Sequence, residues 1–188
     1  MSTPDDQTPV SPIAARAQAA KTSRRATLRR WAKEIAIVLA IFLGVQWWQS
    51  RGTVEGPAPA LEAQGLDGAL SLSALKGQAA VVHFWATWCG VCKAEEGSID
   101  AFAKDAPMIS VAVQSGGADK VRAYRQERGI SFPMAVDPEG TLAAQWGVTK
   151  FPTTFFIAPD GTIRSVAVGW TSSLGLRARL WWASMFSA

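Results

Sequence analysis

The sequence predicts an α/β domain, built as a central mixed sheet flanked by helices, behind an amino-terminal transmembrane anchor. Three observations support this prediction. Short apolar runs alternate with helical segments from residue 61 onward. A cluster of arginines precedes an apolar stretch that begins at residue 31. Near the carboxyl end, two apolar runs flank Pro159-Asp160-Gly161, a sequence typical of a β-hairpin turn.

Charge is distributed unevenly along the 188 residues. The formal net charge is +4, but residues 1–34 hold seven Lys and Arg against three acidic residues, and residues 51–188 hold twelve of each. The main domain is therefore neutral. A nucleic-acid-binding protein normally carries its basic patch on the folded domain, so we expect no nucleic-acid partner.

The first fifty residues are expected to form a tail and a membrane anchor. Residues 1–30 are predicted to be a disordered, basic cytoplasmic tail, because they are mostly polar and lack an apolar period. Residues 31–50 are predicted to be the transmembrane anchor, since the stretch from Trp31 to Trp48 would measure about 27 Å as a helix. The arginines before it predict that the domain lies outside the cytoplasm.

Two other interpretations of this apolar segment stay open, a cleaved signal peptide and a buried core helix. The Ala-x-Ala sequence at 58–60 lies far from the apolar run and has proline at its centre, so it is a poor cleavage site. A core helix would not normally follow so dense a block of arginines. We therefore expect a single-pass protein of a bacterial inner membrane, with a linker over 51–60 and a periplasmic or otherwise extracytoplasmic domain over 61–188.

The domain is predicted to follow the order β-α-β-α-β-α-β-β-α. Strands separated by helices indicate parallel pairing through right-handed crossovers, and the terminal hairpin adds an antiparallel edge. The first strand is expected at the centre of the sheet and Pro133–Val136 at an edge. The expected strands are 79–85, 108–114, 133–136, 153–157 and 162–168, and the expected helices are 91–104, 118–128, 142–146 and 173–186.

Cys89 and Cys92 form a Cys-x-x-Cys sequence where the first strand ends and the first helix begins. A loop this short is a poor structural staple. A closed zinc site needs four ligands, and His83 is the only histidine. Because the thiolate is the reactive form of cysteine and a helix amino terminus lowers the thiol pKa, we expect redox chemistry. Cys89 is predicted to be the exposed nucleophile and Cys92, one turn further inside, the resolving thiol.

Two carboxylates follow on the same helical face as Cys92. Glu95 and Glu96 lie three and four residues after it, beside the apolar Ile99. The resolving thiol must lose its proton in a poorly solvated place, so we hypothesise that Glu95 relays the Cys92 proton. The competing interpretation is that both carboxylates only favour the first turns of the helix electrostatically.

Phe151-Pro152-Thr153 begins a later strand. Proline cannot donate to a sheet ladder, and a cis peptide bond is the usual reason for a proline at such a tight entry. A turn proline in trans is the alternative.

The run from Phe84 to Cys92, Phe-Trp-Ala-Thr-Trp-Cys-Gly-Val-Cys, followed by Phe151-Pro152-Thr153, resembles the thioredoxin superfamily. More narrowly, the chain is similar to the membrane-tethered TlpA/ResA-like branch, which includes ScsD-type proteins linked to copper tolerance. The resemblance covers residues 61–188. It implies a thioredoxin-like fold, a Cys89–Cys92 pair that cycles between dithiol and disulfide, and a cis-proline at Pro152 that faces the pair.

The same resemblance bears on neighbouring residues. Glu95 occupies the acid position of the branch's Cys-x-x-Cys-x-x-Glu pattern, which supports the proton relay. His83 stands where thioredoxin has a buried aspartate, so tuning of Cys92 and an ordinary core role both stay open. Gly90-Val91 matches neither the Gly-Pro of thioredoxin nor the Pro-His of strong oxidants, so no redox potential is implied. The residues expected to contact substrate are Trp88, Gly90, Val91 and Phe151.

The implied activity is that of a protein-disulfide reductase with no bound cofactor or metal. Its expected partners are client proteins with disulfides and a membrane thiol carrier of the DsbD/CcdA type that re-reduces it. Two alternatives stay open: reduction of apocytochrome c during cytochrome c maturation, and copper binding or delivery by the two thiols. The direction of exchange depends on the reduction potential relative to the compartment, which the sequence does not specify.

Overall fold

The computed structural model describes residues 30–41, 44 and 56–185, and the chain divides into two compact units, 1–47 and 48–188. In the first unit residues 30–41 are helical, and Arg30 pairs with Glu34 one turn later at 3.4 Å. Among the described residues, none of the helices combines the length and the apolar character needed to cross a bilayer. The predicted tail up to residue 29, parts of the predicted anchor and the first half of the predicted linker lie outside the described residues.

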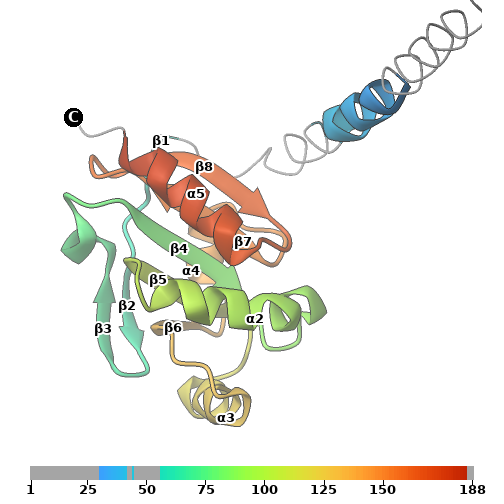
Figure 1. Cartoon of the computed structure of the whole chain (residues 1–188). Coiled ribbons are helices and arrows are strands. Elements are labelled where there is room, and N and C mark those ends of the chain that lie inside the picture. The colour runs from blue at the N-terminus through green and yellow to red at the C-terminus, as the bar shows by residue number, and fades with distance from the viewer. Residues whose placement is uncertain (1–29, 42–43, 45–55, 186–188) are drawn as a thin grey trace, which may run out of the picture. The chain divides into compact units, whose positions relative to one another are not determined.

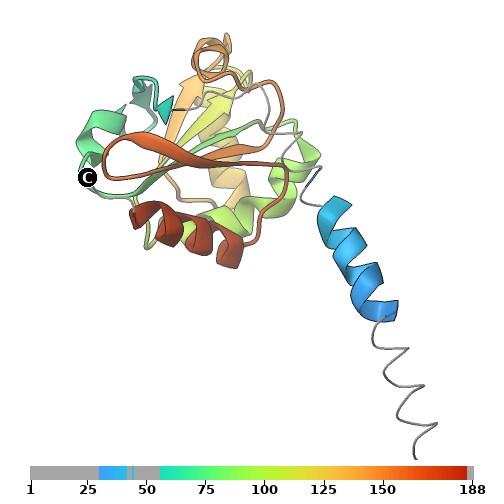
Figure 2. The same cartoon turned by 90° about the horizontal axis from the view of Figure 1, so that it is seen from above.

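The second unit is an eight-stranded mixed sheet with helices on both faces (Figures 1 and 2). The strand order is β1-β8-β7-β4-β5-β6-β2-β3; β4, β5 and β6 run parallel, and the other pairings are antiparallel. The strands are β1 (Gly56–Pro57), β2 (Glu62–Gly65), β3 (Gly68–Ser71), β4 (Ala80–Trp85), β5 (Met108–Val113), β6 (Met134–Asp137), β7 (Thr153–Ile157) and β8 (Thr162–Val168). The helices are η1 (Leu72–Leu75), α2 (Gly90–Ala103), α3 (Ala118–Arg128), α4 (Thr141–Gln145) and α5 (Ser173–Ser184).

The central strands explain the two-faced core. Every residue of β4 is buried, and successive side chains point to opposite faces of the sheet. Val81 and Trp85 join the cluster that α2, α3 and α5 cover, whereas Val82 and Phe84 join the cluster on the face of α4 and η1. A strand buried on both sides reads as a continuous apolar run in the sequence, which is why this one was recognisable.

Most predicted elements are confirmed. The helix 118–128 and the strands 153–157 and 162–168 have the expected bounds, and the other elements shift by one or two residues. Gly129, at a left-handed φ of +63°, ends α3, as its position after the last polar turn indicates. At the hairpin, Asp160 accepts a hydrogen bond from the Thr162 N–H at 2.8 Å and Gly161 has a φ of +84°, so both turn residues are used.

The outer border of the sheet differs from the prediction in two ways. The strand expected at an edge, now β6, is interior, because β2 pairs with it at Gly65↔Ala135 and β3 pairs with β2. Two residues of the predicted linker belong to the sheet, since β1 (Gly56–Pro57) pairs with β8 at Gly56↔Ile163. Leu61 is buried. The hairpin β2–β3 was missed because its strands are short, half exposed and rich in glycine, so they show no apolar alternation.

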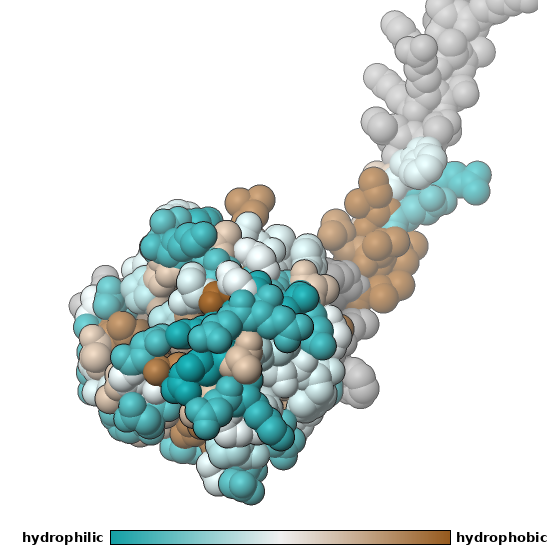
Figure 3. Space-filling model, turned by 90° about the horizontal axis from the view of Figure 1, so that it is seen from below, coloured by the Kyte–Doolittle hydropathy of each residue, from teal (hydrophilic) through white to brown (hydrophobic). Residues whose placement is uncertain are grey.

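The surface seen from below in Figure 3 is mainly hydrophilic, with apolar groups scattered over it. Helix α3 lies at the bottom of Figure 1. Most of its residues are charged or polar, and only Val121 of this helix is buried. One apolar row and a polar remainder are what a helix needs when it covers a sheet and faces water.

Candidate active site

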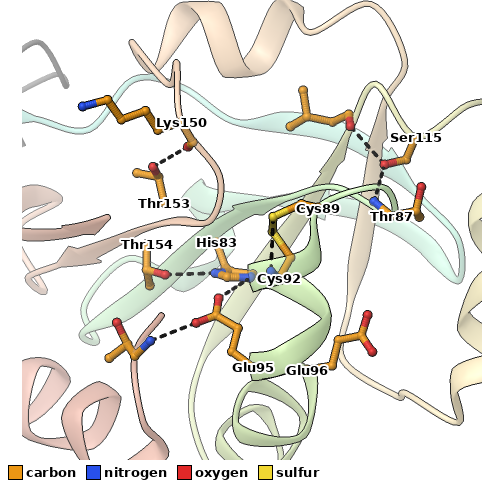
Figure 4. The surroundings of a disulfide bond; sticks show 12 residues. His83, Thr87, Cys89, Cys92, Glu95, Glu96, Ser115, Lys150, Thr153 and Thr154 are labelled. Atoms are coloured by element: carbon orange, nitrogen blue, oxygen red, sulfur yellow. Dashed lines mark hydrogen bonds and ion pairs between the residues drawn. A yellow bond between two sulfur atoms is a disulfide. The ribbon is translucent and has the colours of Figure 1, made fainter. Parts of the chain in front are cut away.

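The two cysteines lie where β4 gives way to α2, and they are joined by a disulfide (Figure 4). Cys89 is the N-cap of α2, with extended backbone at φ −83° and ψ 113°. Its Sγ accepts a hydrogen bond from the Cys92 N–H at 3.2 Å. The sulfur therefore occupies the place where free N–H groups and the helix dipole stabilise negative charge, which is the environment that lowers a thiol pKa.

The two sulfurs differ in depth. Cys89 retains 8% of its surface and Cys92 2%, so the order of burial is the predicted one. The expectation that Cys89 would be exposed is wrong for the disulfide form, because the residue is largely covered. Its neighbours Gly90 and Val91 are exposed, and Val91 retains 46% of its surface. Access to the disulfide therefore passes over the first turn of α2.

The loop after β5 holds the residues before Cys89. The Thr87 N–H donates to Ser115 Oγ at 3.0 Å, and this hydroxyl donates to the carbonyl oxygen of Val113 at 3.0 Å. The Trp88 indole N–H donates to the carbonyl oxygen of Gln114 at 3.0 Å. Gln114 has a φ of +46°, an uncommon conformation for a residue with a side chain. Trp88 is thus oriented by a hydrogen bond although 59% of it is exposed.

The loop before β7 forms the other side of the site. The peptide bond between Phe151 and Pro152 is cis, and Pro152 is buried. Thr153 Oγ1 donates to the Lys150 carbonyl oxygen at 2.8 Å, which ties the loop to the first residue of the strand. Phe151 meets Trp88 edge to face, with ring centroids 5.6 Å apart and an interplanar angle of 85°. The aromatic pair therefore joins the cysteine loop to the proline loop.

Glu95 lies in a nearly closed environment on the sheet side of α2. It retains 1% of its surface, and Oε2 accepts a hydrogen bond from the Thr171 N–H at 3.0 Å. Among the described residues Oε1 has no hydrogen-bond partner, and His83 Nε2 lies 3.6 Å from it (Figure 4). Burial raises the pKa of this carboxyl to about 7, while the Thr171 hydrogen bond acts in the opposite direction. A carboxyl of this kind exchanges its proton near neutrality.

His83 is equally enclosed. It retains 2% of its surface, and its Nδ1 lies 2.9 Å from Thr154 Oγ1. Burial lowers the pKa of the imidazole to about 3, so His83 is neutral at physiological pH. The resemblance to thioredoxin places His83 near Cys92, but the sequence does not indicate its contacts with Glu95 and Thr154. The alternation of side chains along a strand could have indicated the face on which His83 lies. His83 lies two residues before Trp85 and so faces the same side of the sheet.

Glu96 points to the other side of α2 in Figure 4 and has charged and polar partners. The Tyr124 hydroxyl donates to its Oε1, and the Arg128 Nε donates to its Oε2 at 2.9 Å. Both partners belong to α3, and Glu96 retains 5% of its surface. Glu96 therefore connects two helices and takes no part in the disulfide's surroundings.

Comparisons with known proteins agree with this geometry. Residues 54–166 match the model of the AhpC/TSA family. The thioredoxin-like protein YneN of Bacillus subtilis is 30% identical over 76% of this chain and 91% of its own length. The thiol-disulfide oxidoreductase ResA of Oceanobacillus iheyensis is 35% identical over 53% of this chain and 54% of its own length. The chain spans less than two thirds of the length of several curated relatives that it matches.

A solved structure shows the same architecture. The crystal structure of a thiol:disulfide interchange protein of the thioredoxin family from Chlorobium tepidum superposes with a TM-score of 0.61 at 27% identity. The superposition covers 69% of this chain and 97% of that one. Three observations support one family assignment: the α/β fold with a mixed sheet, the cysteine pair at the start of α2 and the family match. The chain belongs to the AhpC/TSA family and is a TlpA/ResA-like member of the thioredoxin superfamily.

Proposed function

We propose that the protein is a thiol–disulfide oxidoreductase that acts as a protein-disulfide reductase through Cys89 and Cys92. The observation that carries this proposal is the position of Cys89 Sγ, which caps α2 and accepts the Cys92 N–H. A thiolate formed on that sulfur is stabilised before any substrate arrives. The names of relatives such as ResA, a thiol-disulfide oxidoreductase, support the same activity.

The exchange proceeds in two steps. The Cys89 thiolate attacks one sulfur of a client disulfide, and the client's other sulfur leaves with the bonding electron pair and takes up a proton. Cys92 then gives its proton to the Glu95 carboxylate and attacks Cys89 Sγ, and the second client sulfur leaves as a thiolate. Two electrons pass from the dithiol to the client, and Cys89 and Cys92 end as the disulfide that the structure contains.

Glu95 is the proposed proton acceptor for Cys92. Its burial and its pKa of about 7 suit a base that must work beside a poorly solvated thiol. It lies one turn after Cys92 on α2, and the two side chains share the side of the helix that faces His83 (Figure 4). Glu96 does not compete for this role, because Tyr124 and Arg128 occupy both of its oxygens.

The proposed client-binding surface surrounds the disulfide. Trp88 and Val91 are exposed beside it, and Phe151 closes the surface from the proline loop. Gly90 is exposed and has open space around the position of a side chain, so a client backbone has room to approach there. Pro152 has no N–H to donate to an approaching chain, and its carbonyl oxygen already accepts the Gly169 N–H at 2.8 Å.

The proposed setting is the outer face of a bacterial inner membrane. The arginine-rich residues 1–30 would stay in the cytoplasm, residues 31–50 would span the bilayer, and residues 51–60 would lead to the periplasmic domain. A membrane thiol carrier of the DsbD/CcdA type would restore the dithiol. Apocytochrome c, whose haem-binding cysteines must be reduced, is one candidate client.

Copper binding by the two thiols is the weaker alternative. Two thiolates can hold Cu(I), but the structure joins these two sulfurs in a disulfide. Within residues 30–41, 44 and 56–185, no three His, Cys, Asp or Glu side chains converge to hold a metal ion. No observation on the described domain favours this alternative over disulfide exchange.

A trapping experiment tests the proposal. A Cys92→Ala variant should retain clients as mixed disulfides on Cys89, and a Cys89→Ser variant should trap none. The wild-type chain should reduce insulin when dithiothreitol supplies electrons, and Cys89→Ser should not. Insulin reduction that persists in Cys89→Ser, or a stoichiometric Cu(I) complex without any trapped client, would refute the assignment. The reduction potential of the pair then decides the direction.

A further inference from the structure

His83 and Glu95 face each other inside the domain, one on β4 and the other on α2 (Figure 4). Both are at least 98% buried. Their nearest polar atoms, His83 Nε2 and Glu95 Oε1, are 3.6 Å apart, just beyond hydrogen-bond distance. Within the part of the chain that the structure describes, Oε1 has no hydrogen-bond partner in the disulfide form. A shift of about half an ångström would make this contact a hydrogen bond.

The imidazole is held from its other side. His83 lies directly opposite Thr154 in the β4–β7 register, and its Nδ1 is 2.9 Å from the threonine hydroxyl. Two fixed strands therefore set the ring's position, and Nε2 is left pointing toward α2. The carboxyl is held in the same way, because the Thr171 N–H binds Oε2 and leaves Oε1 pointing toward the ring.

The other groups around the pair do not replace this contact. On β5, Ser110 lies opposite His83, but its hydroxyl is engaged with the Trp85 indole and the Pro133 carbonyl. On α2, Cys92 is buried, and its sulfur is bonded to Cys89 in the disulfide. On α5, Arg177 pairs with Asp105 at 2.8 Å, and Arg179 lies over the Phe156 ring at 6.0 Å.

Elementary hydrogen-bond chemistry makes the arrangement reversible. A neutral imidazole has one donor and one acceptor nitrogen, and a threonine hydroxyl both donates and accepts. When Nδ1 donates to Thr154, Nε2 accepts a hydrogen bond from the hydroxyl of the neutral carboxyl. When the threonine hydroxyl donates to Nδ1, Nε2 carries the hydrogen and donates to a carboxylate. One histidine can therefore serve both protonation states of Glu95.

We propose that His83 is the positioning residue for Glu95, accepting a hydrogen bond from its protonated form and donating one to its ionised form, with Thr154 adjusting to each state. This inference rests on the proposed relay, because a relay must hold the proton and release it in every cycle. Without such a partner, only the Thr171 N–H would offset the desolvation cost of the ionised carboxyl. His83 would therefore keep the two forms of Glu95 close in free energy.

Three substitutions of His83 test the proposal. His83→Leu removes both nitrogens. His83→Asn places an amide near the Nδ1 position, within reach of Thr154, and His83→Gln extends an amide to the Nε2 position, within reach of Glu95. Leu and Asn should each raise the apparent Glu95 midpoint by about one pH unit, equivalent to a tenfold change in its ionisation constant. Gln should return the midpoint to within about half of that shift.

The Glu95 midpoint is read directly, by infrared difference spectroscopy of the carboxyl band in the full-length oxidised chain, with Glu95→Gln identifying the band. The pH profile of Cys92 attack on a mixed disulfide should move with it, by the same amount in the same variants. Equal midpoints in wild type, Leu and Asn would overturn the proposal. A Gln shift as large as the Leu shift would also overturn it, because the ring would then only fill space.

If His83→Leu does not fold, the comparison of the Asn and Gln variants still decides the test.

The design also separates this inference from the proposed function. Insulin reduction by the wild-type chain tests the oxidoreductase, whereas the oxidised chain reports the Glu95 midpoint without any turnover. Suppose that the His83 variants shift the Glu95 midpoint as expected, but the wild-type chain reduces no disulfide. The His83–Glu95 interaction would then stand, and the proposed proton relay would be refuted.

Discussion

Glu95 and Glu96 are consecutive residues of one helix, both buried, and their surroundings are opposite in kind. Glu96 places both oxygens on partners from α3, the Tyr124 hydroxyl and the Arg128 guanidinium. Glu95 has one backbone N–H and a neutral imidazole 3.6 Å away. On one side of α2 the charge of the buried glutamate is therefore balanced by a cation and a hydroxyl. On the other side it is nearly unbalanced.

The difference separates a structural carboxylate from a functional one. A buried carboxylate that is bonded to a hydroxyl and a guanidinium of the next helix connects the two helices. A buried carboxyl without a counter-ion has its pKa raised toward neutrality, here to about 7, and can exchange a proton during turnover. Burial alone does not identify a catalytic acid; the partners of the carboxyl do.

The largest expected effect is on the rate of the second exchange step. Glu95→Gln should slow the attack of Cys92 on a mixed disulfide by about a hundredfold or more at pH 7, because the thiol loses its proton acceptor. Glu96→Gln, the matched control, should slow it by less than about threefold, since Glu96 faces α3. Stopped-flow release of a chromophoric thiol measures both rates. Equal rates in the two variants would remove the distinction between the glutamates.

The next effect is on the pH dependence of stability. Folding raises the pKa of Glu95 from 4.5 to about 7, so the folded state binds more protons between these values and stability falls as pH rises. Relative to wild type, Glu95→Gln should therefore gain up to about 3 kcal/mol between pH 4.5 and 7. Urea unfolding across this range measures the trend.

His83 provides the opposite slope for the same experiment. Folding lowers its pKa from 6.5 to about 3, so the unfolded state binds more protons in that window and stability falls as pH drops. Relative to wild type, His83→Leu should therefore gain stability as pH falls from 6.5 toward 3. Parallel slopes in the Glu95 and His83 variants would contradict the assigned protonation states.

A smaller effect concerns the contribution of Glu96 to stability, on the side of α2 that faces α3. Glu96→Gln should lower the free energy of unfolding by about 2 kcal/mol at pH 7, because the buried amide loses a charge-assisted hydrogen bond with Arg128. Glu95→Gln should not lower it at that pH. Chemical denaturation of both variants in one buffer makes the comparison, and an equal loss in both would mean that the two sites are equivalent.

The smallest effect belongs to the tyrosine. Tyr124→Phe should cost about 1 kcal/mol, since it removes one hydrogen bond to Glu96 and keeps the ring that packs on Trp85 at 5.7 Å. The Cys92 attack rate should not change. A slower Cys92 attack in this variant would show that the Tyr124–Glu96 contact affects the disulfide.

Local patterns account for much of the fold and of the candidate site. The apolar run of β4, the glycine after α3 and the turn around Asp160 each have a local physical cause, so their elements were predictable. The short polar strands β2 and β3 were not, because only pairing with β6 makes them part of a sheet. These strands contain glycine and other residues of low strand propensity, so their sequence does not predict a strand.

The sequence by itself determined the reactive pair, because a Cys-x-x-Cys between a strand and a helix places Cys89 at the N-cap wherever the fold occurs. It also placed two glutamates one turn beyond Cys92. Only the tertiary structure decided which glutamate has a counter-ion and which faces His83, since Arg128, Thr154 and Thr171 come from distant parts of the chain. Helical spacing sets a side chain's direction, but its electrostatic environment is made by whatever packs against it.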